Sequence, residues 1–236
     1  MLKELYKTNL HAKENVLVSH IVKFISPITT YLLLKTKLRP NDITILMIFS
    51  GIIGAILFAI DNLLIKILGI IFIYLWFTFD LSDGEVARIK KQFSKFGKEI
   101  DYCAHIINHP LFNISFAINL VKMTGNSVYY LIFMILISCN LVYRFIINMN
   151  YLYALKTDSQ NYLNKSNNFL DYHSLKSIII QIINIFIHYP NFALIFPVIF
   201  LINSQIAIYY LFIVVIINCI YIPYLCFNFV NKIKAI

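Results

Sequence analysis

A short acidic stretch in an otherwise apolar chain has residue types and spacings suited to chemistry. The 236 residues include only 11 Asp and Glu. Five of these lie close together: Asp80, Asp83, Glu85, Glu99 and Asp101. Long apolar runs flank the stretch on both sides. Because a carboxylate at or near a bilayer is costly unless it is paired, hydrated or bound to a metal, this cluster is a candidate functional site.

The spacing of these residues places them on two helix faces. Asp80 and Asp83 share one face, and Asp101 and His105 share one face of the next helix. If the faces meet, carboxylates and an imidazole converge, and carboxylate oxygens are the ligands that hard divalent cations prefer. Arg88, one turn beyond Asp83, can bind a phosphate through two hydrogen bonds. The pattern indicates a site for metal and diphosphate. The alternative is a buried salt-bridge network of Asp80 or Asp83 with Arg88.

The same stretch carries a longer motif with the spacing D-x2-D-G-x2-A-R-x8-G-x3-D. Seven positions match it: Asp80, Asp83, Gly84, Ala87, Arg88, Gly97 and Asp101. This motif resembles the signature of the CDP-alcohol phosphatidyltransferase family, integral membrane enzymes of phospholipid synthesis. The resemblance implies that a phosphatidyl or phosphoalcohol group moves from a CDP-linked donor to an alcohol acceptor and that CMP is released.

The resemblance also implies roles for the motif residues. The expected ligands of a divalent metal, Mg²⁺ or Mn²⁺, are Asp80, Asp83 and Asp101. The residues expected to contact the CDP moiety are Gly84, Ala87, Arg88 and Gly97.

One position departs from the family pattern. The last aspartate of the signature, generally assigned as the base that deprotonates the attacking hydroxyl and as a metal contact, is His105 here. Three interpretations stay open. The imidazole is the general base, or it is a metal ligand that favours Mn²⁺ over Mg²⁺, or the protein is a catalytically degenerate relative that binds CDP-lipid. His109, one turn further along the same face, is a candidate proton relay or a packing residue.

The rest of the chain predicts a membrane protein. It is 60% hydrophobic and 13% charged, with a mean hydropathy of +0.75, whereas soluble domains are nearer half apolar and a quarter charged. We predict an all-α fold, a polytopic bundle of six transmembrane helices with an N-terminal amphipathic interfacial helix at residues 16–38. Residues 1–41 form the N-terminal cytoplasmic and interfacial segment, and residues 42–236 form the membrane domain. The predicted spans are residues 42–60, 63–83, 100–122, 127–148, 175–200 and 204–230.

The distribution of basic residues orients this bundle. Of the 20 Lys and Arg, 18 fall on the side that holds both termini and the connection after the second span. Only Lys66 and Lys122 fall toward the other side. By the positive-inside rule the acidic cluster faces the cytoplasm, and we expect the plasma membrane of a prokaryote. Topology and anionic lipid headgroups account for the net charge of +9, so the charge gives no support to nucleic-acid binding.

The expected partners follow from the implied reaction. They are a CDP-linked donor, either a lipid or a soluble alcohol, an alcohol or alcohol-phosphate acceptor, membrane lipid and a second copy of the chain. Arg144, in the last turn of the fourth span, is a candidate for binding the acceptor phosphate, and the alternative is that its guanidinium reaches out to the interface. A cation-handling transporter is an alternative function, but its charges are expected near the bilayer midplane, often within paired repeats.

Overall fold

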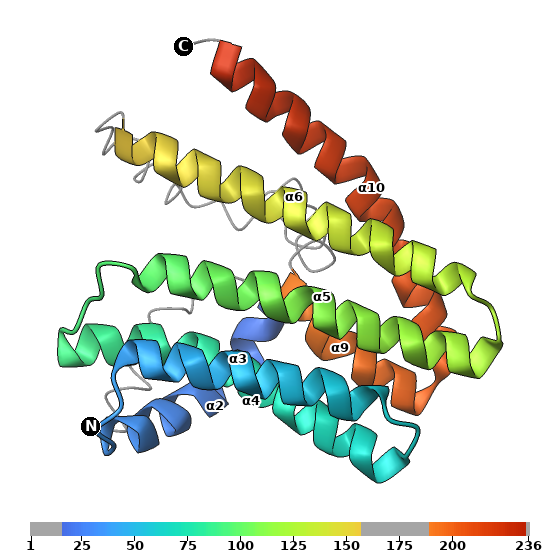
Figure 1. Ribbon diagram of the computed structural model, residues 1–236, viewed down its shortest axis with the longest axis horizontal. Coiled ribbons are helices and arrows are strands. Elements are labelled where there is room, and N and C mark those ends of the chain that lie inside the picture. The colour runs from blue at the N-terminus through green and yellow to red at the C-terminus, as the bar shows by residue number, and fades with distance from the viewer. Residues whose placement is uncertain (1–15, 157–188, 235–236) are drawn as a thin grey trace.

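The computed structural model describes residues 16–156 and 189–234, and this part of the chain is all-α without a strand. The all-α fold class is therefore confirmed for the described residues. The helices, shown in Figure 1, are α2 (Val16–Leu34), α3 (Pro40–Ala59), α4 (Leu63–Lys90), α5 (Gly97–Thr124), α6 (Val128–Lys156), α9 (Tyr189–Ile202) and α10 (Ser204–Lys234).

Four described helices are long and apolar enough to cross a membrane, which supports an integral membrane protein. They cover Pro40–Ala59, Leu63–Lys90, Val128–Asn150 and Ser204–Asn231. Helix α5 overlaps the third predicted span, and α9 overlaps the fifth from Tyr189 onward. The earlier part of the fifth span lies outside the described residues. The count of six spans, the interfacial placement of the N-terminal helix and the division at residue 41 stay predictions.

Close contact between the backbones of α3 and α4 sets the position of the acidic helix end. A Cβ atom added to Gly69 would lie 2.6 Å from the backbone nitrogen of Phe58. One added to Gly54 would lie 3.0 Å from the backbone nitrogen of Ile73, so glycine permits an approach that larger residues would block. Figure 1 shows α3, α4, α5 and α6 running in alternating directions. The end of α4 and the start of α5 therefore lie at one end of the bundle.

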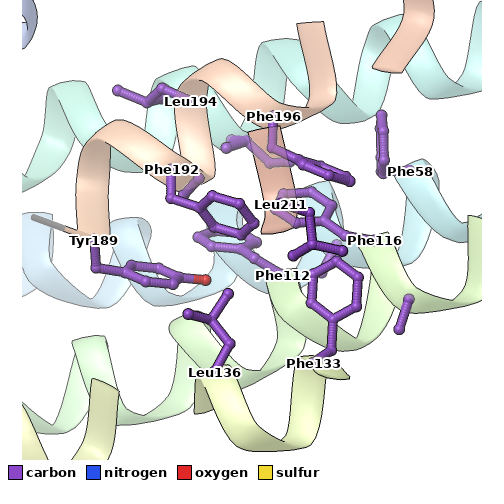
Figure 2. Packing of buried hydrophobic residues seen from close by; sticks show 14 of the residues in the cluster. Phe58, Phe112, Phe116, Phe133, Leu136, Tyr189, Phe192, Leu194, Phe196 and Leu211 are labelled. Atoms are coloured by element: carbon purple, nitrogen blue, oxygen red, sulfur yellow. The ribbon is translucent and has the colours of Figure 1, made fainter. Parts of the chain in front are cut away.

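Aromatic side chains fill the core between α3, α5, α6 and α9 (Figure 2). The ring centroid of Phe116 lies 5.4 Å from that of Phe58 and 4.8 Å from that of Phe196. Phe133 of α6 packs edge-on against Phe116 at 6.5 Å. Such aromatic pairs contribute about 0.5–1.5 kcal/mol each beyond their burial. They anchor α5, whose N-terminal half carries part of the acidic cluster.

Helix α4 continues beyond the end of the predicted span, and its last turn is held by the chain that precedes α3. The helix ends where Lys91 adopts a left-handed backbone conformation with φ of 52°. The ammonium of Lys90 donates hydrogen bonds to the carbonyl oxygens of Thr36 and Leu38, at 3.2 and 2.9 Å. All motif residues from 80 to 88 therefore lie on one helix.

Candidate active site

The two predicted faces of α4 and α5 meet, and His105 lies between two carboxylates. Its Nε2 is 3.0 Å from Oδ1 of Asp80 and 3.3 Å from Oδ1 of Asp101. The imidazole is buried, with 6% of its side-chain surface exposed, whereas Asp80 and Asp101 expose 17% and 44%. The cluster is thus open on the side of the carboxylates and closed behind the imidazole.

These three side chains fit a divalent cation. One potential ligand atom from each of Asp80, Asp101 and His105 lies within 4.8 Å of the other two. Two carboxylate oxygens supply negative charge, and the imidazole nitrogen makes the set suitable for Mn²⁺ or a similar borderline ion as well as Mg²⁺. A cation at Nε2 of His105 requires that this nitrogen carry no proton.

Asp83, the third aspartate predicted to bind metal, has a different neighbour. The hydroxyl of Thr44 on α3 donates a hydrogen bond to Oδ2 of Asp83 at 2.7 Å. Asp83 does not belong to the set of three side chains whose ligand atoms lie within 4.8 Å of one another, although it interacts electrostatically with Asp80 and Asp101. It lies beside the cluster, and its role as a metal ligand stays a prediction. Residue spacing does not predict the contact of Thr44 with Asp83, because the two residues belong to different helices.

The residues predicted to contact CDP lie around the junction of α4 and α5. The guanidinium of exposed Arg88 folds back over Gly84, so that a Cβ atom on Gly84 would lie 3.3 Å from Nη1 of Arg88. Ala87 is partly exposed on the same helix. Gly97 begins α5, and an added Cβ there would meet Ser94 at an ordinary 3.5 Å, so packing among the described residues does not demand glycine at this position. The contact of Gly97 with the CDP moiety stays a prediction.

Arg144 of α6 approaches the cluster from the other side of α5. It lines a small pocket between α5 and α6 that His105 and His109 also line. Its guanidinium interacts electrostatically with the carboxylates of Asp80 and Asp101. The structure therefore places Arg144 near the predicted site, and its binding of an acceptor phosphate stays a prediction.

Two aromatic residues that the sequence analysis did not name enclose the imidazoles. Trp76 of α4 packs edge-on against both His105 and His109, with ring centroids 5.7 and 5.6 Å away. Tyr189 of α9 stacks on His109 at 3.7 Å. The place of Trp76 near the site could be predicted from the sequence, because it precedes Asp80 by one helix turn on the same face. No local pattern predicts the place of Tyr189, since it comes from a distant part of the chain.

Comparison with known proteins identifies the family. The family model for CDP-alcohol phosphatidyltransferase matches residues 37–220. The chain belongs to the CDP-alcohol phosphatidyltransferase family. The matched region contains every site residue described above and begins just before α3. No curated protein matches the chain.

Proposed function

We propose that this CDP-alcohol phosphatidyltransferase moves a phosphatidyl or phosphoalcohol group from a CDP-linked donor to an alcohol acceptor, with release of CMP, as a step of phospholipid biosynthesis. The observation that carries the proposal is the convergence of Asp80, Asp101 and His105 at the junction of α4 and α5, within the family motif. The site combines metal-binding oxygens with a nitrogen that can accept a proton.

The donor diphosphate binds at the carboxylate side of the cluster. Asp80, Asp83 and Asp101 would hold a divalent cation, Mg²⁺ or Mn²⁺. His105 would join them as a ligand only in the alternative in which its Nε2 is not the base. When bound, this cation offsets the negative charge of the diphosphate. Arg88 pairs with diphosphate oxygens through its planar guanidinium. Gly84, Ala87 and Gly97 leave space for the CDP moiety to approach the helix backbones.

The acceptor reacts beside His105. The acceptor hydroxyl attacks the phosphorus that carries the alcohol or diacylglycerol, and Nε2 of His105 takes the hydroxyl proton. A new O–P bond forms, the bond between that phosphorus and the oxygen of CMP breaks, and CMP leaves with the electron pair. Arg144 binds the phosphate of an alcohol-phosphate acceptor, since its guanidinium lies on the His105 side of the cluster.

The site faces the cytoplasm of a prokaryotic plasma membrane in this proposal. Lys66, one of the two basic residues expected on the opposite side, donates a hydrogen bond to Asp61 at 2.9 Å, which lowers the pKa of that carboxyl. Lys122 donates to the carbonyl oxygen of Ala59. The positive-inside rule counts Lys and Arg, and these two residues stand against 18 on the other side, which supports a cytoplasmic site. Membrane lipid and a second copy of the chain stay expected partners.

The direct test measures CMP release. The full chain, purified in lipid nanodiscs, is incubated with CDP-diacylglycerol or soluble CDP-alcohols and a panel of alcohols and alcohol phosphates, in Mg²⁺ or Mn²⁺. We expect CMP release that requires one donor class, an acceptor and the cation, and that disappears in Asp101→Ala. If the wild type binds a CDP-linked donor but releases no CMP with any acceptor in either cation, the degenerate relative is the correct interpretation.

A further inference from the structure

Both ring nitrogens of His105 have defined neighbours. Nε2 faces Asp80 and Asp101, and Nδ1 lies 3.1 Å from Nε2 of His109, one turn further along α5. His105 and His109 are 5% and 3% exposed, so bulk water has little access to the contact between them. The site thus uses one nitrogen of His105, and His109 meets the other.

The ring of His109 is held from two helices. Tyr189 of α9 stacks on it with 27° between the ring planes, and Trp76 of α4 packs edge-on at 78°. The Tyr189 hydroxyl donates a hydrogen bond to the backbone carbonyl of His109 at 2.7 Å. The side-chain amide of Asn113 donates to the same carbonyl at 2.9 Å and to the Tyr189 oxygen at 3.0 Å. Figure 2 shows Tyr189 at the edge of the aromatic core, which supports it in turn.

The position of His109 bears on which nitrogen of His105 carries the proton. A neutral imidazole has one N–H and one lone pair. At this site the lone pair is needed on Nε2, whether that nitrogen takes a proton from a hydroxyl or binds a cation. The proton then resides on Nδ1, and a buried N–H that lacks an acceptor costs free energy. Nε2 of His109 lies in position to accept it.

The competing tautomer of His105 is favoured by the site itself. With the proton on Nε2, the imidazole donates to Asp80 and Asp101 at the observed 3.0 and 3.3 Å and has no lone pair for chemistry. Loss of the acceptor at His109 would therefore shift His105 toward the unproductive form. Metal-bound histidines commonly donate their other N–H to such a partner, and loss of the partner typically costs 10–100-fold in metal affinity or activity.

We propose that His109 is a positioning residue that accepts the Nδ1–H hydrogen bond of His105 and so keeps the Nε2 lone pair available for a cation beside Asp80 and Asp101 or for the proton of the acceptor hydroxyl. The inference rests on the proposed function, because that function gives Nε2 its task. His109 touches no substrate in this scheme and acts through His105. The position of His109 is fixed by its contacts with Tyr189, Trp76 and Asn113.

The test compares two His109 variants that lose the hydrogen-bond acceptor with one that keeps it, all made in the full-length protein in nanodiscs. His109→Phe keeps an aromatic ring against Tyr189 but removes the acceptor, whereas His109→Gln places a carbonyl oxygen near the position of Nε2. His109→Asn is polar but too short to reach His105, and it provides a second comparison with His109→Gln if the Phe variant does not fold. Phe116→Leu, two turns along α5, controls for loosening of the core. The affinity for Mn²⁺ is measured without substrate by electron paramagnetic resonance, alongside thermal unfolding and CMP release.

We expect His109→Phe and His109→Asn to lose about 10–100-fold relative to the wild type, in Mn²⁺ affinity where Nε2 of His105 binds the cation and in kcat where Nε2 is the base. His109→Gln and Phe116→Leu should stay within about threefold of the wild type in both quantities, and KM for the donor should change little in all four variants. Wild-type Mn²⁺ affinity together with wild-type kcat in folded His109→Phe or His109→Asn overturns the proposal. Equal losses in all three His109 variants and in Phe116→Leu also overturn it, because packing alone would then explain the effect.

The same measurements separate this inference from the proposed function. A wild type that binds Mn²⁺ but releases no CMP refutes the transferase and leaves the affinity comparison to decide the role of His109. A wild type that releases CMP, with His109 variants of unchanged Mn²⁺ affinity and unchanged kcat, retains the transferase and refutes the role of His109. A wild type that does not bind Mn²⁺ or Mg²⁺ refutes both.

Discussion

Replacement of His105 by aspartate restores the family signature and changes the charge of the cluster. In the metal-free wild type, an imidazole with a proton on Nε2 donates to Asp80 at 3.0 Å and to Asp101 at 3.3 Å, so both contacts are favourable. In His105→Asp, three carboxylates occupy a space in which the present ligand atoms lie within 4.8 Å of one another. Without a cation the variant therefore replaces two attractive contacts with two repulsive ones.

The size of this effect follows from distance and exposure. Two unit charges about 5 Å apart interact by about 3 kcal/mol at the effective dielectric constant of a protein surface and by about 1 kcal/mol in water. Asp80 is mostly shielded and Asp101 is half-exposed, so the first value suits Asp80 and the second suits Asp101. We expect the metal-free variant to be on the order of 2–4 kcal/mol less stable than the wild type, with saturating Mg²⁺ recovering most of the loss.

Thermal unfolding of purified protein, with EDTA and with excess Mg²⁺, measures this prediction. A change of 1 kcal/mol corresponds to about 2–4 °C in a chain of this size. The stabilisation by Mg²⁺ should be larger in His105→Asp than in the wild type, and the Phe116→Leu control should show no increase. Equal stability of wild type and His105→Asp in EDTA, with no extra response to Mg²⁺, would refute the electrostatic reasoning and the idea that these three positions share a cation.

Activity of the same variant separates the three interpretations of His105. If His105 is the base, His105→Asp retains substantial CMP release, and His105→Ala loses about 10²–10⁴-fold. If His105 is mainly a metal ligand, His105→Asp shifts the preferred cation from Mn²⁺ toward Mg²⁺. If the protein is degenerate, the wild type is inactive and His105→Asp gains activity. Full activity in His105→Ala would remove the residue from the mechanism.

Three further predictions concern the metal, the donor and the topology. Asp80→Ala and Asp101→Ala should nearly abolish CMP release without unfolding the protein, because the carboxylates hold the required cation; wild-type rates in excess EDTA would contradict this. Arg88→Lys should weaken the apparent affinity for the CDP donor, since one ammonium does not replace a bidentate guanidinium; unchanged affinity with lost stability would indicate a structural salt bridge instead. Lys95→Cys, in a cysteine-free background, should react with an impermeant thiol reagent only from the cytoplasmic side, and labelling from outside would reverse the proposed orientation.

Local features of the sequence were sufficient to predict the class, the family and the pairs of site residues. A helix places residues three or four apart on one face whatever surrounds it, so Asp80 with Asp83 and Asp101 with His105 could be grouped from spacing. The all-α class is confirmed in the described residues, and the family match confirms the resemblance. The six-span count and the cytoplasmic orientation depend on the bilayer and stay predictions.

Only the tertiary structure decided which side chains meet. The faces of α4 and α5 could have met with Asp83 against His105, but the packed helices place Asp80 there and direct Asp83 to Thr44. That arrangement depends on the close contact of α3 and α4 at Gly54 and Gly69, which no residue within the motif encodes. Spacing along one helix reports which side chains share a face. The partner of that face is selected by close packing against segments distant in sequence.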